Sequence, residues 1–365
     1  MSNFAEYPGI HDKMSYIRYL ILIISVTVSA SVHAQTQTYV IHSPSENEDH
    51  YINNVVMTRF KGRFYCMWQS SAKDEDSPDT HVMYSTSHSG KTWSQPKILA
   101  HATDTSFASP GGWIVHDGEL TAFINIFRDI KTGGTAHYMT SSDGRHWSGM
   151  MRVHMDGGDP MDGIMEQDPH IIDGGRIVGA AHFRPGLKAR PIYTDDPTGH
   201  GGWKIGRIEM EDRGTQSRGI EPSLYVRADG SIVMLFRDQA SSFRKLAAES
   251  RDRGESWTRP YLTYLIDSRS KQCAGNLPDG RAFIVGNPAT SKDRTTLAVS
   301  FSDDGVEFDK AVILRSPDGL SKQRYKGKYK TLGYSYPKAF IHRGWLYVTY
   351  SENKEKAMVT RIRIR

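Results

Sequence analysis

The stretch Ser250-Arg-Asp-Arg-Gly-Glu-Ser-Trp257 decides the fold. It follows the pattern Ser-x-Asp-x-Gly-x-x-Trp, in which the Asp and Gly make a tight turn and the Trp pins it. Upstream, residues 219–239 hold two apolar runs split by Ala228-Asp229-Gly230, a hairpin signal. Runs at 245–249 and 261–266 complete an antiparallel meander of four strands. Such a sheet cannot bury its faces alone, so we expect it to stack against copies of itself.

Copies of this turn recur along the chain. The turn aromatic stands at Trp93, Trp147, Trp203, Trp257 and Phe308, at intervals of 54, 56, 54 and 51 residues. The other copies depart from the pattern: His88 takes the Asp position, Asp143 is shifted by one, Phe301 replaces the Ser, and residues 195–199 are an insertion. A period of this length with four short strands each predicts an all-β fold, a β-propeller.

The repeat also predicts how many blades there are. With the Trp257 repeat as template, the inner strands begin near Tyr51, Trp113, His170, Pro222, Cys273 and Pro337. This gives six four-stranded antiparallel blades. The last repeat stops after its third strand, 358–365, and residues 38–42 can supply the fourth. The N-terminal strand therefore closes the ring and removes the exposed sheet edges.

The N-terminus has the pattern of a secretory signal. Lys13 and Arg18 flank an apolar stretch, Tyr19–Ala30, and Val32-His33-Ala34 offers small residues at a cleavage site. The apolar stretch is short for a membrane span. We expect a signal peptide at 1–34, a single propeller domain at 35–365 without a membrane span, and a secreted or periplasmic protein.

Composition and charge exclude several classes. With 38% apolar residues the chain is too polar for a polytopic membrane protein, and its net charge of +5 is too small and too dispersed for a nucleic-acid binder. The basic run 322–330 is typical of a solvated loop. Cys66 and Cys273 lie in different repeats, which favours two buried free thiols over a disulfide or a Cys-based metal site. We expect no cofactor and no metal, and the oligomeric state stays open.

In a propeller, one rim is built from the starts of the inner strands and the loops that leave the second strands. Six repeats send polar side chains to this rim. They are His50, Asn53, Gln69, Glu166, Asp168, His170, His182, Arg184, Glu221, Arg237, Asp238, Lys271, Gln272, Asn287, Tyr334, Tyr336 and Asn353. The combination of Arg/Lys side chains with acid–base groups predicts a polar ligand, a sugar acid. The opposite rim holds the Asp turns, which we interpret as structural.

Two family resemblances refine this expectation. The Ser-x-Asp-x-Gly-x-x-Trp turns resemble the Asp boxes of the sialidase superfamily, and the segments around Glu221, Arg237 and Tyr334-Ser-Tyr336 resemble those that carry a glutamate, a carboxylate-binding arginine and a tyrosine nucleophile. The resemblance implies that Glu221 activates Tyr334 or Tyr336 and that Arg237 binds a carboxylate. Tyr51-Ile-Asn-Asn stands where an Arg-Ile-Pro motif is expected, and residues 270–272 supply no third arginine, which disfavours a true sialidase.

A second resemblance covers nearly the whole mature chain. Segments at 42–47, 67–71, 218–223, 236–242, 271–280 and 325–328 resemble a secreted bacterial propeller family that removes α-1,4-linked L-rhamnose from D-glucuronate on arabinogalactan, as a hydrolase or a lyase. That family relies on one catalytic histidine and is usually counted as seven-bladed, so seven blades stay open. It implies His50, or alternatively His182, as the acid or base, and Arg237 as the carboxylate clamp. The further substrate-binding candidates are Gln69, Lys271, Gln272 and Arg184.

Three function classes remain open at this stage. The first is removal of rhamnose from glucuronate, with a histidine as acid or base. The second is an exo-sialidase-like glycosidase, or hydrolysis by two carboxylates, for which Glu221 would pair with Glu166 or Asp168. The third is a propeller that binds glycans without catalysis. All three expect an oligo- or polysaccharide ligand that contains a uronic acid or a related sugar acid.

Overall fold

The computed structural model describes residues 36–75, 77–129, 133–165, 167–183, 188–208 and 219–364. The predicted signal segment and two rim candidates, Glu166 and Arg184, lie outside these residues. In the part of the chain that is described, no helix is both long and apolar enough to cross a membrane.

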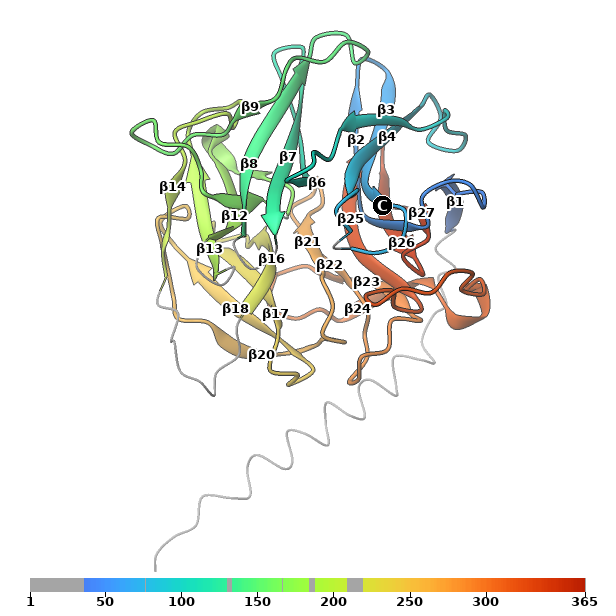
Figure 1. Ribbon diagram of the computed structural model, residues 1–365. Coiled ribbons are helices and arrows are strands. Elements are labelled where there is room, and N and C mark those ends of the chain that lie inside the picture. The colour runs from blue at the N-terminus through green and yellow to red at the C-terminus, as the bar shows by residue number, and fades with distance from the viewer. Residues whose placement is uncertain are drawn as a thin grey trace, which may run out of the picture. The chain divides into compact units, whose positions relative to one another are not determined.

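Six antiparallel sheets make up the molecule (Figure 1). The first three, inner strand first, are β2 (Tyr51–Phe60), β3 (Arg63–Ser71), β4 (His81–Ser87) and β5 (Lys97–Ala100); β6 (Phe107–His116), β7 (Glu119–Asp129), β8 (Gly133–Ser141) and β9 (Met151–Arg152); and β10 (Gly163–Met165) with β11 (His170–Ile171), β12 (Ile177–Phe183), β13 (Lys188–Thr194) and β14 (Lys204–Ile205). In the third sheet the inner strand is thus split into two short pieces.

The other three sheets follow the same order. They are β16 (Gly219–Val226), β17 (Ile232–Asp238), β18 (Arg244–Ser250) and β20 (Tyr261–Ile266); β21 (Cys273–Asn276), β22 (Ala282–Gly286), β23 (Leu297–Ser302) and β24 (Lys310–Arg315); and β25 (Tyr334–His342), β26 (Trp345–Glu352), β27 (Lys356–Arg363) and β1 (Gln37–His42). A small parallel pair, β15 (Arg207–Ile208) with β19 (Ser256–Trp257), links the third and fourth sheets.

The ring closes as the sequence predicts. β1 pairs antiparallel with β27, with Tyr39 opposite Val359, so the first strand completes the last sheet. Figure 1 shows β25, β26 and β27 beside β2 of the first sheet. The fold is therefore an all-β propeller of six blades, which settles the blade number at six.

The core lies between neighbouring blades. Met67 and Tyr65 of the first blade, for example, pack with Trp113 and Ile124 of the second in one buried cluster. The inner strands are buried on both faces because a blade has a neighbour on either side, which explains their long apolar runs. Cys66 and Cys273 are buried free thiols, as predicted.

The Asp turns are hydrogen-bonded as the sequence pattern predicts. Asp252 accepts from the backbone N–H of Ser256 at 2.8 Å, while the Ser250 hydroxyl accepts from the N–H of Gly254 at 2.9 Å. Trp257 closes the turn by donating its indole N–H to the Gly254 carbonyl at 2.9 Å. These bonds satisfy the turn backbone locally, as an Asx or Ser turn does.

Two expectations about the degraded copies were wrong. In the Phe308 turn, Ser302 rather than Phe301 occupies the Ser position: its hydroxyl donates to Asp304 at 2.8 Å and accepts from Gly305 N–H at 2.8 Å. In the Trp93 turn, Ser89, not His88, stands at the Asp position. These copies have one residue fewer than the Trp257 turn, so a template of fixed length shifts the assignment by one position.

Candidate active site

Three inner strands carry the same distortion near the propeller axis. β2, β16 and β25 each lose register, between Asn53 and Val56, Ile220 and Ser223, and Ser335 and Lys338. At these bulges Asn54, Glu221 and Tyr336 adopt left-handed backbone angles, with φ of 50°, 52° and 58°. A bulge re-aims a side chain, and strained non-glycine residues of this kind gather at functional sites. The distortions point to one site shared by several blades.

Glu221 is the centre of that site. Its two carboxylate oxygens accept hydrogen bonds from different blades: the Tyr336 hydroxyl donates to Oε1 at 2.7 Å, and Arg237 Nη1 donates to Oε2 at 2.8 Å. The side chains of Glu221 and Arg237 are only 7% and 14% exposed. Burial opposes the charge of Arg237, but Glu221 and Tyr336 more than offset it and raise its pKa above the usual range. The Glu221 carboxylate is thus placed to accept the proton of the Tyr336 hydroxyl.

Arg294 adds a second arginine to the site, and the sequence analysis missed it. It lies on the loop after β22, where its Nη1 contacts the Ser335 hydroxyl at 3.4 Å, next to Tyr336. Burial lowers the pKa of Arg294; the nearby Tyr336 opposes this and the nearby Arg237 adds to it. Arg294 is not among the rim residues that the sequence analysis names. The feature of the sequence that could have indicated Arg294 is its position on the loop after β22, the second strand of its blade.

The sequence analysis also missed Glu75 and Lys354. Glu75 lies on the loop that leaves β3, and its Oε2 pairs with Lys354 Nζ at 2.9 Å. Lys354 is 3% exposed, and its ammonium sits 5.1 Å from the centre of the Tyr336 ring and 5.6 Å from that of Tyr51. Burial, with Glu75 nearby, raises the pKa of Tyr51 well above its usual value. A second carboxylate, that of Glu75, therefore lies near the Glu221–Tyr336 pair, because Lys354 pairs with Glu75 and also contacts the Tyr336 ring.

A buried hairpin presents Lys354. Residues 352–355 turn between β26 and β27, with Asn353 and Lys354 both at left-handed φ. The Lys354 carbonyl accepts from Ile52 N–H of β2 at 2.9 Å, and Asn353 N–H donates to Gly333 at 2.8 Å. The turn is thus bonded to the inner strand of one neighbouring blade and to the start of its own, which fixes the ammonium at the axis.

Several predicted residues reach the site but use their polar atoms on the backbone. Gln272 donates both amide hydrogens to carbonyls, of Glu221 at 3.0 Å and Leu235 at 3.1 Å, and Gln69 donates to the Glu75 carbonyl at 3.1 Å. His182 accepts the backbone N–H of Glu221 at 3.2 Å. Lys271 lies over the Tyr336 ring, 5.1 Å from its centre. Of these four, Lys271 lies against the predicted nucleophile, and Gln69, His182 and Gln272 brace the loops.

His50 has a different environment. Its ring stacks on Tyr325 with centres 3.7 Å apart, Nε2 bonds to the Glu46 carbonyl at 3.0 Å, and its own carbonyl accepts from Lys330 at 2.6 Å. These contacts attach the N-terminal segment to the loop before β25. The His50 ring is thus bonded to a backbone carbonyl and stacked on Tyr325. The role of His50 as acid or base stays a prediction.

Asp168 and His170 form a separate polar group along the axis. Asp168 lies 3.7 Å from Lys338 Nζ, and burial raises its pKa, partly offset by Lys338. Burial, together with Lys338, lowers the pKa of His170 to about 4. A side-chain carbon on Gly112 would come within 2.7 Å of an Asp168 oxygen, which explains the glycine on β6.

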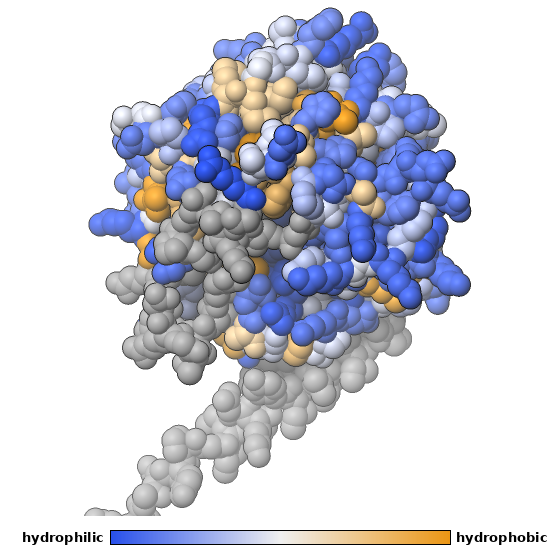
Figure 2. Space-filling view, viewed as in Figure 1, coloured by the Kyte–Doolittle hydropathy of each residue, from blue (hydrophilic) through white to orange (hydrophobic). Residues whose placement is uncertain are grey.

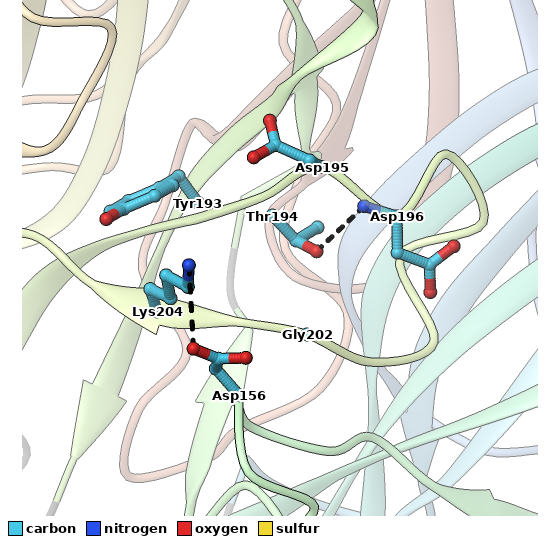
Figure 3. A pocket seen from close by; sticks show the side chains of 7 residues that line it. All are labelled: Asp156, Tyr193, Thr194, Asp195, Asp196, Gly202 and Lys204. Carbon is cyan, nitrogen blue, oxygen red and sulfur yellow. Dashed lines mark hydrogen bonds and ion pairs between the residues drawn. The ribbon is translucent and has the colours of Figure 1, made fainter.

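A hollow at the other end of the third blade is drawn in Figure 3. It is lined by Asp156, Tyr193, Thr194, Asp195, Asp196, Gly202 and Lys204. Thr194 pairs with Ile177 at the start of β12, whereas His182 lies near its end, so this hollow belongs to the Asp-turn rim. Lys204 and Asp156 pair across it at 3.5 Å, and the Thr194 hydroxyl is occupied by Asp196 N–H. Among the described residues, no group of three or more His, Cys, Asp or Glu side chains is placed to hold a metal ion.

The arrangement suits displacement at a sugar carbon. A tyrosine hydroxyl bonded to a buried carboxylate is an activated nucleophile, and two arginines beside it can bind an anion in forked geometry. A second carboxylate, Glu75, comes from a different blade than Glu221 and can supply or remove a proton.

Comparisons with solved structures agree with the fold. The chain matches a protein of unknown function from Dyadobacter fermentans with a TM-score of 0.68 at 15% identity, over 90% of this chain and 99% of that one. It matches the K499G mutant of NanB sialidase from Streptococcus pneumoniae with a TM-score of 0.65 at 13% identity, over 93% and 72%. A leech intramolecular trans-sialidase gives 0.63 at 13% identity, over 90% and 70%.

A search of curated protein sequences finds no match. Of the family models, that of the BNR repeat-like domain matches residues 62–348. These residues run from the first blade into the last and contain all the Asp turns described above. The match covers more than half of the sequence, and the chain therefore belongs to the BNR repeat-like domain family.

Proposed function

We propose that the protein is a sialidase-like glycosidase that removes a terminal, carboxylate-bearing sugar from a glycan. The observation that carries this proposal is the Glu221 carboxylate bridging the Tyr336 hydroxyl and the Arg237 guanidinium. The comparisons support the proposal because sialidases share the fold with this chain, at 13% sequence identity. In the first step Glu221 takes the Tyr336 proton as the phenolic oxygen attacks the anomeric carbon, and the bond to the leaving oxygen breaks.

Glu75, which shares a proton with the Lys354 ammonium, is the group placed to protonate that leaving oxygen. It comes from a different blade than Glu221, and Lys354 holds its carboxylate at 2.9 Å. In the second step the Glu75–Lys354 pair takes a proton from water, whose oxygen attacks the anomeric carbon. The bond to Tyr336 breaks, and Glu221 returns its proton to the Tyr336 oxygen. Two displacements at one carbon return the original configuration.

Arg237 and Arg294 are the clamp for the substrate carboxylate. Within the described part of the chain, the buried Nε of each guanidinium has no hydrogen-bond partner. Buried donors without partners are costly, and a carboxylate would satisfy them. Asn53, not a third arginine, stands on the first inner strand, and Lys354 and Lys271 supply further positive charge near Tyr336. The clamp therefore suits a uronate as well as a sialic acid.

Removal of rhamnose from glucuronate is the second candidate. It rests on the sequence resemblance and on a uronate fitting these cations. It needs a histidine as acid or base, yet His50 and His182 each bond to the backbone through Nε2. Secretion, predicted from residues 1–34, would place the enzyme where glycans are exposed.

A substrate panel tests the proposal. The protein is incubated with nitrophenyl glycosides of N-acetylneuraminic acid and glucuronic acid, and with a rhamnose-capped glucuronide. We expect nitrophenol release from a carboxylated glycoside and none from a nitrophenyl galactoside, which is included as the neutral control. Free rhamnose without a rise in ultraviolet absorbance would support the second candidate as a hydrolase, and free rhamnose together with the absorbance of an unsaturated uronate would support it as a lyase. If none of these substrates reacts, the proposed activity is wrong and a glycan-binding propeller is favoured.

A further inference from the structure

The loop before β25 carries an unusual density of positive charge. Between residues 322 and 330, every second residue is basic: Lys322, Arg324, Lys326, Lys328 and Lys330. The first four are exposed, whereas the side chain of Lys330 is buried. Such a run is ordinarily a freely solvated loop. The contacts of this loop show a different arrangement.

Two carboxylates, one of them buried, hold the loop in place through its backbone. Glu355, 1% exposed, accepts the N–H groups of Arg324 at 3.0 Å and Tyr325 at 2.7 Å, and pairs with Lys330 at 3.4 Å. Asp74 accepts the N–H groups of Lys328 and, at 3.0 Å, Tyr329. The two carboxylates therefore accept hydrogen bonds from the loop backbone and do not pair with the side chains of Lys322, Arg324 or Lys326. None of the described carboxylates forms an ion pair with Lys322, Arg324 or Lys326.

The loop also lies on the proton-donor side of the site. Asp74 is the chain neighbour of Glu75, and Glu355 is the neighbour of Lys354, which holds the Glu75 carboxylate. The two anchors of the basic loop are thus each one residue away from the Glu75–Lys354 pair. Because a proton donor stands beside the leaving oxygen, the remainder of the glycan leaves the site on this side.

An aromatic ring accompanies the charge. Tyr329 is 38% exposed, and the Lys328 ammonium lies 4.7 Å from the centre of its ring. Aromatic faces beside cations bind sugar rings that carry anionic groups, since the ring covers the apolar face of the sugar and the cation meets its charge. In the view of Figure 2 the hydrophobic residues form small, separate patches, in keeping with a polar partner.

We propose that this basic loop, residues 322–329, is the binding surface for the leaving portion of the substrate, and that this portion is itself anionic. The inference rests on the proposed function for the assignment of Glu75, and it narrows the substrate to acidic polysaccharides with charged units beyond the terminal sugar. Exposed cations beside a binding site also raise the association rate of an anionic polysaccharide, and salt weakens this effect by screening the charges.

The binding test does not depend on turnover. In the Tyr336→Phe background, a Lys322→Gln/Lys326→Gln/Lys328→Gln variant is compared with Lys91→Gln/Lys97→Gln/Lys310→Gln, which removes the same charge from the Asp-turn rim. Affinity electrophoresis uses polygalacturonate as the anionic probe and dextran as the neutral one. We expect the first variant to bind polygalacturonate about tenfold more weakly than the control variant. Equal binding by the two variants would overturn the proposal, as would equal retardation by dextran.

A kinetic arm separates this proposal from the proposed function. With Tyr336 intact, both triple variants are assayed on a nitrophenyl glycoside of the terminal sugar, whose leaving group is small. We expect equal kcat/KM for the two variants there, and about a tenfold loss for the loop variant on an acidic polysaccharide. Absence of any nitrophenol release would reject the proposed function while the electrophoresis still decides the binding surface. A loss on the small substrate equal to that on the polymer would reject the surface as a separate element.

Discussion

The two rims of this propeller are built from the same strands and behave in opposite ways. At the Asp-turn rim the blades repeat one another, and each turn satisfies its own backbone, as Ser250, Asp252 and Trp257 do. At the other rim the blades differ, and residues from separate blades satisfy one another, as Glu221 does for Tyr336 and Arg237. The residues that recur from blade to blade stabilise the fold, whereas those that differ between blades are available for binding and catalysis.

The sharpest test of this contrast is a pair of tyrosines on one strand. Tyr336→Phe removes the proposed nucleophile and should lower kcat by about 10³-fold or more, because the covalent step is lost. Tyr334→Phe is the matched control: its hydroxyl donates to the Ser316 carbonyl at 3.0 Å, away from Glu221. Steady-state kinetics on the nitrophenyl glycoside measure both. Equal losses would show that the strand, and not the Tyr336 hydroxyl, matters.

Glu75 offers a test that depends on the leaving group. Glu75→Gln should cost about 10²–10³-fold in kcat with a sugar leaving group, because the leaving oxygen then needs a proton. With a nitrophenyl leaving group the first step should change little. Glu255→Gln, at the Asp-turn rim where Glu255 pairs with Arg176, is the control and should change neither rate. A uniform loss of kcat/KM, which reports only the steps up to departure of the leaving group, would contradict the role of Glu75 as proton donor.

Arg294 can be compared with an arginine of the opposite rim. Arg294→Ala should raise KM for a carboxylated substrate by about 10–100-fold, the value of one or two hydrogen bonds to a charged group. Arg176→Ala breaks pairs with Asp195 and Glu255 and should leave KM unchanged. Isothermal titration with the released sugar acid checks the affinity directly. If Arg294→Ala binds that acid normally, the clamp lies elsewhere.

The axial His170 predicts a stability change with pH. Its pKa is lowered to about 4, so between that value and the unfolded value of about 6.5 the unfolded chain binds more protons. Stability from His170 is therefore fully present above about pH 6.5 and is lost as the pH falls toward 4, by about 2 kcal/mol for a half-buried ring. Asp168 acts in the opposite sense because its pKa is raised.

Urea denaturation of wild type and His170→Gln at pH 7 and pH 4.5 isolates the His170 contribution. The difference in unfolding free energy between the two proteins should shift in favour of the variant at the lower pH. An unchanged difference would mean that the ring is protonated in the folded state, against the lowered pKa.

The smallest effect is expected at the Asp-turn rim. Asp252→Ala removes the acceptor of the Ser256 N–H and should cost about 1 kcal/mol of stability with kcat unchanged. Thermal melts and kinetics on the same preparation measure both quantities. A fall in kcat without a fall in stability would break the division between the two rims.

The sequence predicts the repeating rim better than the other one. The turn period indicated six blades because each blade obeys the same local rules, and closure by the N-terminal strand followed from the incomplete last repeat. Glu221, Arg237 and Tyr336 were found because they stand on strands at fixed places in that repeat. Whether they perform the proposed steps is for the kinetics above to decide.

Loops explain what the sequence did not predict. Glu75 and Arg294 lie on loops that leave second strands, where the chain path depends on tertiary contacts and no period marks which residue turns inward. Lys354 sits in a run, Glu352-Asn-Lys-Glu355, that is typical of a solvated turn in sequence. The run is nevertheless buried, and the loop 322–330 bonds to its last residue, Glu355. Gln272 is the opposite case: it was predicted to bind substrate and lies at the site, but its amide donates both hydrogens to backbone carbonyls.

The stereochemistry of the first-formed product tests the central claim most directly. Proton NMR, recorded during the first turnovers of the carboxylated nitrophenyl glycoside, distinguishes the two anomers before they equilibrate. If Tyr336, activated by Glu221, attacks the anomeric carbon, two displacements occur and the anomer of the substrate appears first. An inverted anomer, or an unsaturated sugar in its place, would contradict the account.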